Sequence, residues 1–161
     1  VSETGNEPVM ETVDLLDVAK ECVERQKVNA KRSYISLTYL GESAPVLGSR
    51  SLLDELCQNL CDNAIRYNRP GGKVQIITAC SRDGHCTLTV KDNGIGIPKE
   101  AQSSVFERFY RVDKSRSKAT GGTGLGLAIV KHIARIHNAK IKLESEVDEG
   151  TTITVLFETA H

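Results

Sequence analysis

Residues 55–67 read Glu-Leu-Cys-Gln-Asn-Leu-Cys-Asp-Asn-Ala-Ile-Arg-Tyr. At about 100° per residue, Asn59, Asn63 and Arg66 fall within an arc of roughly 60° on a helix. The apolar side chains point elsewhere and form a separate stripe at Leu53, Leu56, Leu60 and Ala64. One face of this helix therefore packs on a core, while the other carries two amides and a guanidinium. An asparagine side-chain oxygen is a suitable ligand for a Mg²⁺ ion that also bridges phosphates. The alternative is that these polar side chains form an ordinary solvated helix face.

A second motif follows the strand predicted over residues 86–91. The segment 91–98 reads Lys-Asp-Asn-Gly-Ile-Gly-Ile-Pro, and its glycines permit positive φ and a close approach of a ligand to the backbone. Asp92, at the end of the strand, accepts hydrogen bonds but cannot donate them when ionised. It therefore suits the exocyclic amine of adenine better than the carbonyl of guanine. The alternative is a tight turn in which the aspartate is only a cap.

A third motif, Gly121-Gly122-Thr123-Gly124-Leu125-Gly126-Leu127, opens an apolar helix. Glycines before a helix N-terminus make an anion site, because unpaired N–H groups point outward there. Leu127 and Ala128 stand where a P-loop requires Lys and then Ser or Thr. The charged segment 114–118 stands where a dinucleotide-binding fingerprint requires a strand. Both of those familiar phosphate motifs are excluded.

The rest of the chain predicts helices and strands around these motifs. Residues 1–12 read as a polar linker or tail, and residues 112–123 as a loop long enough to be functional or mobile. The predicted helices are 13–30, 51–67, 99–110 and 125–137. The predicted strands are 34–40, 73–80, 86–91, 140–147 and 151–158, with a short extended piece at 45–48. These elements predict an α+β fold, a two-layer α/β sandwich. Its mixed, mostly antiparallel sheet has about five strands, with three main helices on one face.

Composition narrows the class of protein. The 161 residues contain 21 basic and 21 acidic side chains, and this balance removes the usual electrostatic argument for nucleic acid binding. No apolar run is long enough to span a membrane and no signal peptide opens the chain, so we expect a soluble domain. The cysteines, which include no C-x-x-C pair, stand at 22, 57, 61, 80 and 86. Buried reduced thiols are the favoured interpretation, and a disulfide or a metal site is the alternative.

The three motifs in this order resemble the catalytic, ATP-binding domain of sensor histidine kinases, in the superfamily that includes gyrase, the Hsp90 chaperones and the MutL repair proteins. The match runs from about Val13 to Phe157 and is closest, though weakly, to the phosphate-sensing type. The family's boxes correspond to residues 59–67, 92–96, 106–110, 122–126 and 150–152. The resemblance implies the Bergerat ATP-binding fold, with ATP and Mg²⁺ as cofactors and residues 13–159 as the catalytic domain.

The resemblance also implies roles for individual residues. Asn63 would hold Mg²⁺ with Asn59 beside it, and Asp92 would take the adenine amine, with Thr152 supporting it near the base. Arg111 and Arg116, in the predicted loop, would contact the γ-phosphate, with Lys114 and Lys118 as further candidates. The remaining implied nucleotide contacts are Arg66, Tyr67, Gly94, Gly96, Gly122, Gly124, Leu125, Gly126 and Thr152.

One position separates kinases from hydrolases in this superfamily. The ATPases carry a glutamate four residues before the magnesium asparagine, and here that position is Asn59, whose amide is no general base. The site should therefore hold ATP without cleaving it efficiently. Catalysis would then consist of positioning and charge neutralisation.

No phosphoacceptor histidine is evident: we interpret His85, His132, His137 and His161 as structural or solvated. The resemblance therefore implies that the acceptor lies on separate dimerisation helices, with a response regulator downstream and a parent protein anchored in the bacterial membrane. This domain would lie on the cytoplasmic side. An anti-sigma-type protein-serine kinase and a non-catalytic nucleotide sensor of the same fold are the alternatives.

Overall fold

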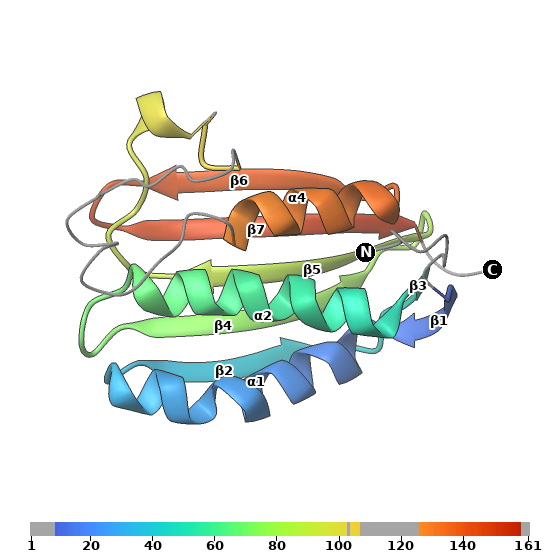
Figure 1. Ribbon diagram of the computed structural model, residues 1–161, viewed down its shortest axis with the longest axis horizontal. Coiled ribbons are helices and arrows are strands. Elements are labelled where there is room, and N and C mark those ends of the chain that lie inside the picture. The colour runs from blue at the N-terminus through green and yellow to red at the C-terminus, as the bar shows by residue number, and fades with distance from the viewer. Residues whose placement is uncertain (1–8, 103, 107–125, 159–161) are drawn as a thin grey trace, which may run out of the picture.

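The computed structural model describes residues 9–102, 104–106 and 126–158. In this part of the chain, three α-helices lie side by side over one face of a five-stranded sheet (Figure 1). They are α1 (Leu15–Arg32), α2 (Arg50–Arg66) and α4 (Gly126–Ile136). The predicted two-layer α+β architecture is confirmed.

The five strands of the sheet follow the order β2-β4-β5-β7-β6. Only β2 and β4 pair in parallel, and the other three pairs are antiparallel. The bounds are β2 Ser36–Gly41, β4 Lys73–Cys80, β5 His85–Asp92, β6 Lys140–Glu146 and β7 Gly150–Glu158. Both β5 and β6 run antiparallel to β7, so they end beside the residues where β7 begins. The turn after β5 and the β6–β7 turn therefore lie at the same end of the sheet (Figure 1).

The N-terminal segment differs from its prediction. Residues 11–12 are not a tail, because β1 (Glu11–Asp14) pairs with β3 (Pro45–Gly48) in a second, two-stranded sheet. Val13 is buried opposite Val46 and does not open the helix. The helix begins at Leu15, since the Asp14 side chain accepts a hydrogen bond from Leu16 N at 3.0 Å and acts as the N-cap.

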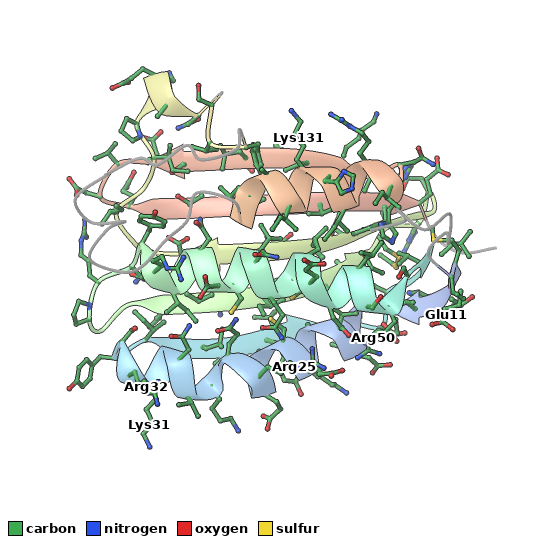
Figure 2. All side chains as sticks on the ribbon, viewed as in Figure 1. Glu11, Arg25, Lys31, Arg32, Arg50 and Lys131 are labelled. Atoms are coloured by element: carbon green, nitrogen blue, oxygen red, sulfur yellow. A yellow bond between two sulfur atoms is a disulfide. The ribbon has the colours of Figure 1, made fainter. Side chains whose placement is uncertain are left out.

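The core lies between the helices and the sheet and is mainly aliphatic, with Phe157 as its largest buried side chain. Leu53, Leu56 and Leu60 of α2 are at most 1% exposed, so the predicted apolar stripe faces the sheet. Glu21 of α1 pairs with both Arg25 and Arg50. Figure 2 places these two arginines at the boundary between α1 and α2, where the pairing supports the packing of the helices.

The cysteines divide into two groups. Cys22, Cys57 and Cys61 are free and buried, as predicted. Cys80 and Cys86, however, form a disulfide, so the prediction of a reduced thiol is wrong for this pair. They are opposite residues of β4 and β5 with Cα atoms 4.1 Å apart. The hairpin register puts them at a non-hydrogen-bonded position, where opposite Cα atoms lie closest.

The segment after β5 is less helical than predicted. In place of a helix over 99–110, the described residues form a 3₁₀ turn, η1 (Lys99–Ala101), followed by non-helical turns at 104–106. Residues 107–110 and the predicted loop 112–123 lie outside the described residues. Within the described part, no helix has the length and apolar character needed to cross a membrane.

Candidate functional site

The amide-bearing face of α2 borders the N-terminus of α4. Ser49 caps α2, and its Oγ accepts a hydrogen bond from Leu52 N at 3.5 Å. The Asn59 side chain donates to Glu55 O at 2.8 Å, one turn earlier. Its Oδ1 faces Gly126, where a Cβ would stand 3.5 Å from that oxygen. The structure therefore brings together residues from two of the predicted motifs, 67 positions apart in the chain.

Asn63 and Arg66 differ in their surroundings. The Asn63 side chain has no hydrogen-bond partner among the described residues, so its amide oxygen is available to a ligand. Arg66 pairs with Asp62 at 3.1 Å and lines a pocket of about 440 Å³ between α1 and α2, together with Arg32 and Tyr34. No sequence motif indicates this pocket.

The acidic glycine turn packs directly on the end of α2. Ile95 N donates to Tyr67 O at 3.1 Å. A Cβ on Gly94 would lie 2.5 Å from the same carbonyl oxygen, so only glycine permits this approach. Gly96 has φ of +74°, and a Cβ there would lie 2.1 Å from Glu146 O. Both glycines therefore shape the site through backbone packing.

Asp92 is the partly buried acid of the site. Its Oδ1 accepts hydrogen bonds from Gly94 N at 2.9 Å and Thr151 N at 3.2 Å. Burial raises the pKa of Asp92 to about 6, and the hydrogen bonds from Gly94 and Thr151 oppose this rise. Its Oδ2 has no hydrogen-bond partner among the described residues. One carboxylate oxygen is thus held by the backbone, and the other is available to a ligand.

Thr151, rather than the predicted Thr152, supports Asp92. Thr151 pairs with Asp92 across β5 and β7 and is buried, whereas Thr152 pairs with exposed Lys91 on the opposite face of the sheet. The side chain of Thr152 therefore points away from Asp92. The alternation of buried Thr151, Ile153, Val155 and Phe157 along β7 was the sequence signal that could have identified it.

Two further residues escaped the sequence analysis. The Ser145 hydroxyl on β6 contacts Ile97 N, Gly150 O and Thr151 Oγ1. Gln102 donates to Ile97 O at 2.9 Å. Single polar residues in a strand or turn carry no motif, so only the three-dimensional structure could reveal their part in the site.

Several predicted site residues cannot be placed. Five predicted nucleotide contacts lie outside the described residues, namely Arg111, Arg116, Gly122, Gly124 and Leu125. The same holds for Lys114, Lys118 and Phe109. Phe106 is described and packs, partly buried, against the core. The described part of the site therefore consists of α2, the turn after β5, the start of β7 and the first turn of α4.

The described residues fit a magnesium–nucleotide complex in their chemistry. Asn63 offers a neutral oxygen ligand of the type that Mg²⁺ accepts beside phosphates and water. No group of three or more His, Cys, Asp or Glu side chains in the described part could hold a metal ion.

The chain matches the family model described as histidine kinase-, DNA gyrase B- and HSP90-like ATPase over residues 48–161. It is 48% identical over 152 residues to the sensor-like histidine kinase SenX3 of Mycolicibacterium smegmatis, covering 92% of this chain and 38% of that protein. It is 38% identical to the sensor histidine kinase YkoH of Bacillus subtilis, covering 97% of this chain and 34% of that protein. The chain thus spans little more than a third of these relatives.

A solved structure gives the same result at the level of fold. The mycobacterial sensor histidine kinase MprB superposes with a TM-score of 0.79 at 32% sequence identity, covering 93% of this chain and 97% of that one. Helices and sheet therefore follow the arrangement found in histidine kinases.

Proposed function

The chain belongs to the family of histidine kinase-, DNA gyrase B- and HSP90-like ATPases, and from this we propose that it binds Mg-ATP and donates the γ-phosphate to a histidine on a separate phosphoacceptor domain. That domain would be the dimerisation helices of a parent kinase, and a response regulator would receive the phosphate next. The parent would be anchored in the bacterial membrane, with this domain on the cytoplasmic side.

The observation that supports the proposal most directly is the carboxylate of Asp92, because only one of its two oxygens is hydrogen-bonded within the described residues. Two backbone N–H groups hold Oδ1, which leaves Oδ2 to accept the adenine amine. The turn that bears Asp92 is hydrogen-bonded to Tyr67, one helical turn from Asn63. Base and phosphates of one nucleotide can therefore meet Asp92 and Asn63 respectively.

The other assignments follow the family's motifs. Asn63 would hold Mg²⁺, and the metal would neutralise charge on the transferred phosphoryl group. Arg111 and Arg116 would contact the γ-phosphate, and the backbone N–H groups of residues 122–126 would hold the phosphates. Arg66 would have to break its ion pair with Asp62 to contact the phosphates. Tyr67 already lies beside the glycine turn after β5.

Direct titration tests the nucleotide pocket. We expect this chain to bind a non-hydrolysable ATP analogue with Mg²⁺ saturably at pH 8 and to bind GTP far more weakly. Because protonated Asp92 offers a donor to the adenine amine, affinity should fall about tenfold between pH 8 and pH 5, on either side of its pKa of about 6. Isothermal calorimetry measures both effects. Equal affinity for the two bases, or a flat pH response, would contradict the assignment of Asp92.

The amide at position 59 explains why we propose a kinase rather than a hydrolase. The Asn59 side chain is already bonded to Glu55 O, and an amide cannot take a proton from water. ATP could then remain intact until its acceptor arrives.

Substitution of Asn59 by Glu tests this point. A carboxylate four residues before Asn63 would supply the missing base, so we expect ATP hydrolysis to rise roughly tenfold or more, as is typical of an added general base. Phosphate release is the measurement, and Gln58→Glu, on the neighbouring face of α2, is the matched control. Hydrolysis that stays at the wild-type level in a folded Asn59→Glu variant removes the support for the kinase–hydrolase distinction.

A further inference from the structure

Ser145 occupies an unusual position on β6. It lies on the sheet face that carries Ile141 and Leu143, which pack against the core, and it pairs with Thr151 of β7. A hydroxyl at such a position must find partners or lose stability. The partners that it has reach the turn that carries Asp92.

The Ser145 hydroxyl uses its full hydrogen-bonding capacity. Its Oγ accepts a hydrogen bond from Ile97 N at 2.7 Å and donates to Gly150 O at 2.9 Å. Thr151 Oγ1 lies 2.8 Å away and can donate to the remaining lone pair. One side chain thus joins the far end of the glycine turn to the start of β7.

Gln102 completes the attachment of the turn. Its Nε2 donates to Ile97 O at 2.9 Å and to Ser145 O at 3.2 Å. Both backbone polar groups of Ile97 are therefore held by side chains, one from Ser145 and one from Gln102. The backbone bond from Asp148 N to Ile95 O at 2.8 Å adds a third link between the turn and the β6–β7 hairpin.

These contacts bear on the two N–H groups that hold Asp92. Gly94 N belongs to the turn and Thr151 N belongs to β7, and both donate to Asp92 Oδ1. Ser145 touches the turn at Ile97 and β7 at Thr151, so it sets the position of one donor relative to the other. Asp92 can keep its orientation only while both donors stay in place.

We propose that Ser145, assisted by Gln102, is a positioning residue for base recognition: it keeps the turn and β7 in register so that Asp92 presents its second carboxylate oxygen to the exocyclic amine of the base. This inference rests on the proposed role of Asp92. Ser145 itself need not touch the nucleotide, because it acts through Ile97 and Thr151.

The test compares two nucleotides that differ only in the amine. ATP and purine riboside triphosphate, which lacks the 6-amino group, are titrated into the 161-residue chain and its variants. Ser145→Ala should weaken ATP about tenfold, the worth of one well-placed hydrogen bond to a charged group. The analogue lacks the contact that Ser145 supports, so its affinity should change by less than about twofold. A purely structural role would weaken both nucleotides equally.

Matched variants complete the design. Thr154→Ala removes a hydroxyl that pairs with Thr89 at 3.3 Å on the opposite face of the sheet, and it should change neither affinity. Ser145→Thr keeps the hydroxyl and should restore most of the preference for ATP. Gln102→Met removes the donor to Ile97 O and should reproduce the selective loss, so it carries the test if Ser145→Ala fails to fold.

The outcomes separate this inference from the function on which it rests. A selective loss of ATP affinity in Ser145→Ala, with rescue by Ser145→Thr, supports it. Equal losses for both nucleotides, or an unchanged preference in both Ser145→Ala and Gln102→Met, overturn the positioning role alone. A wild-type chain that binds the two nucleotides equally overturns the assignment of Asp92, and the positioning role with it.

Discussion

Replacement of Asp92 by Asn is expected to lower the affinity for adenine nucleotides about 100-fold while the fold remains intact. The amide oxygen of Asn can still accept hydrogen bonds from Gly94 N and Thr151 N, which hold Oδ1 in the wild type. The amide nitrogen then faces the adenine amine, so two donors meet where a donor and a charged acceptor met before. Loss of a charged hydrogen bond together with an unpaired donor accounts for a change of this size.

The same substitution should stabilise the protein at pH 8. The folded pKa of Asp92 is about 6, above its ordinary value of 3.8, because burial disfavours the carboxylate. Stability linked to this group is present below about pH 4 and is lost as the pH rises through 6. Asn carries no charge and avoids that loss, which corresponds to about 1–3 kcal/mol in the free energy of unfolding.

Calorimetric titration and thermal unfolding of one variant measure both effects. Asp83→Asn, in the exposed hairpin turn at the far end of the sheet, is the matched control and should change neither quantity appreciably. Weakened binding with equal or higher Tm identifies Asp92 as a carboxylate kept for recognition at a cost in stability. Wild-type affinity in the Asn variant would remove the adenine assignment.

Replacement of Asn63 by Ala is expected to reduce phosphotransfer roughly a thousandfold, because a catalytic metal ion supplies several kcal/mol of charge stabilisation. The amide of Asn63 has no partner among the described residues, so its removal should leave the packing of α2 nearly unchanged. Transfer of labelled γ-phosphate to a phosphoacceptor segment supplied in trans is the direct measurement.

The Mg²⁺ dependence of nucleotide affinity gives an independent measurement on this chain alone. Wild-type affinity for the ATP analogue should rise when Mg²⁺ replaces a chelator, and the Asn63→Ala variant should lose that rise while keeping its affinity without metal. Asn29→Ala removes an amide from the neighbouring helix, where it bonds to Gln26 and Asp62, and serves as the control. A variant that keeps the full Mg²⁺ response would show that Asn63 is not the magnesium ligand.

Local patterns predicted the elements that carry the nucleotide motifs. The spacing of Leu53, Leu56 and Leu60 identified α2 and its buried face, and those side chains are at most 1% exposed. The alternation of apolar residues likewise identified both antiparallel hairpins. Local patterns are enough to identify such elements because each one buries a single face. The apolar residues of that face therefore recur in the sequence at the period of the helix or strand.

The same local reasoning failed where one element depends on another. Val13 looked like the first apolar residue of a helix, yet it lies in a strand because Val46 of the partner strand, 33 positions later, pairs with it. The helix predicted over residues 99–110 begins as a 3₁₀ turn at Lys99–Ala101. On either side of this turn, Ile97 N and the Gln102 side chain bond to Ser145 of β6, contacts that no local pattern reports.

The sequence by itself determined the fold class and the order of the motifs, and it proposed Asn59, Asn63 and Asp92 as site residues. Only the tertiary structure decided that Thr151 rather than Thr152 supports Asp92, that Cys80 meets Cys86, and that Ser145 joins the glycine turn to β7. The physical reason is that periodicity reports which face of an element is buried, whereas hydrogen bonds between side chains depend on the register between strands. That register is set by contacts among residues far apart in the chain.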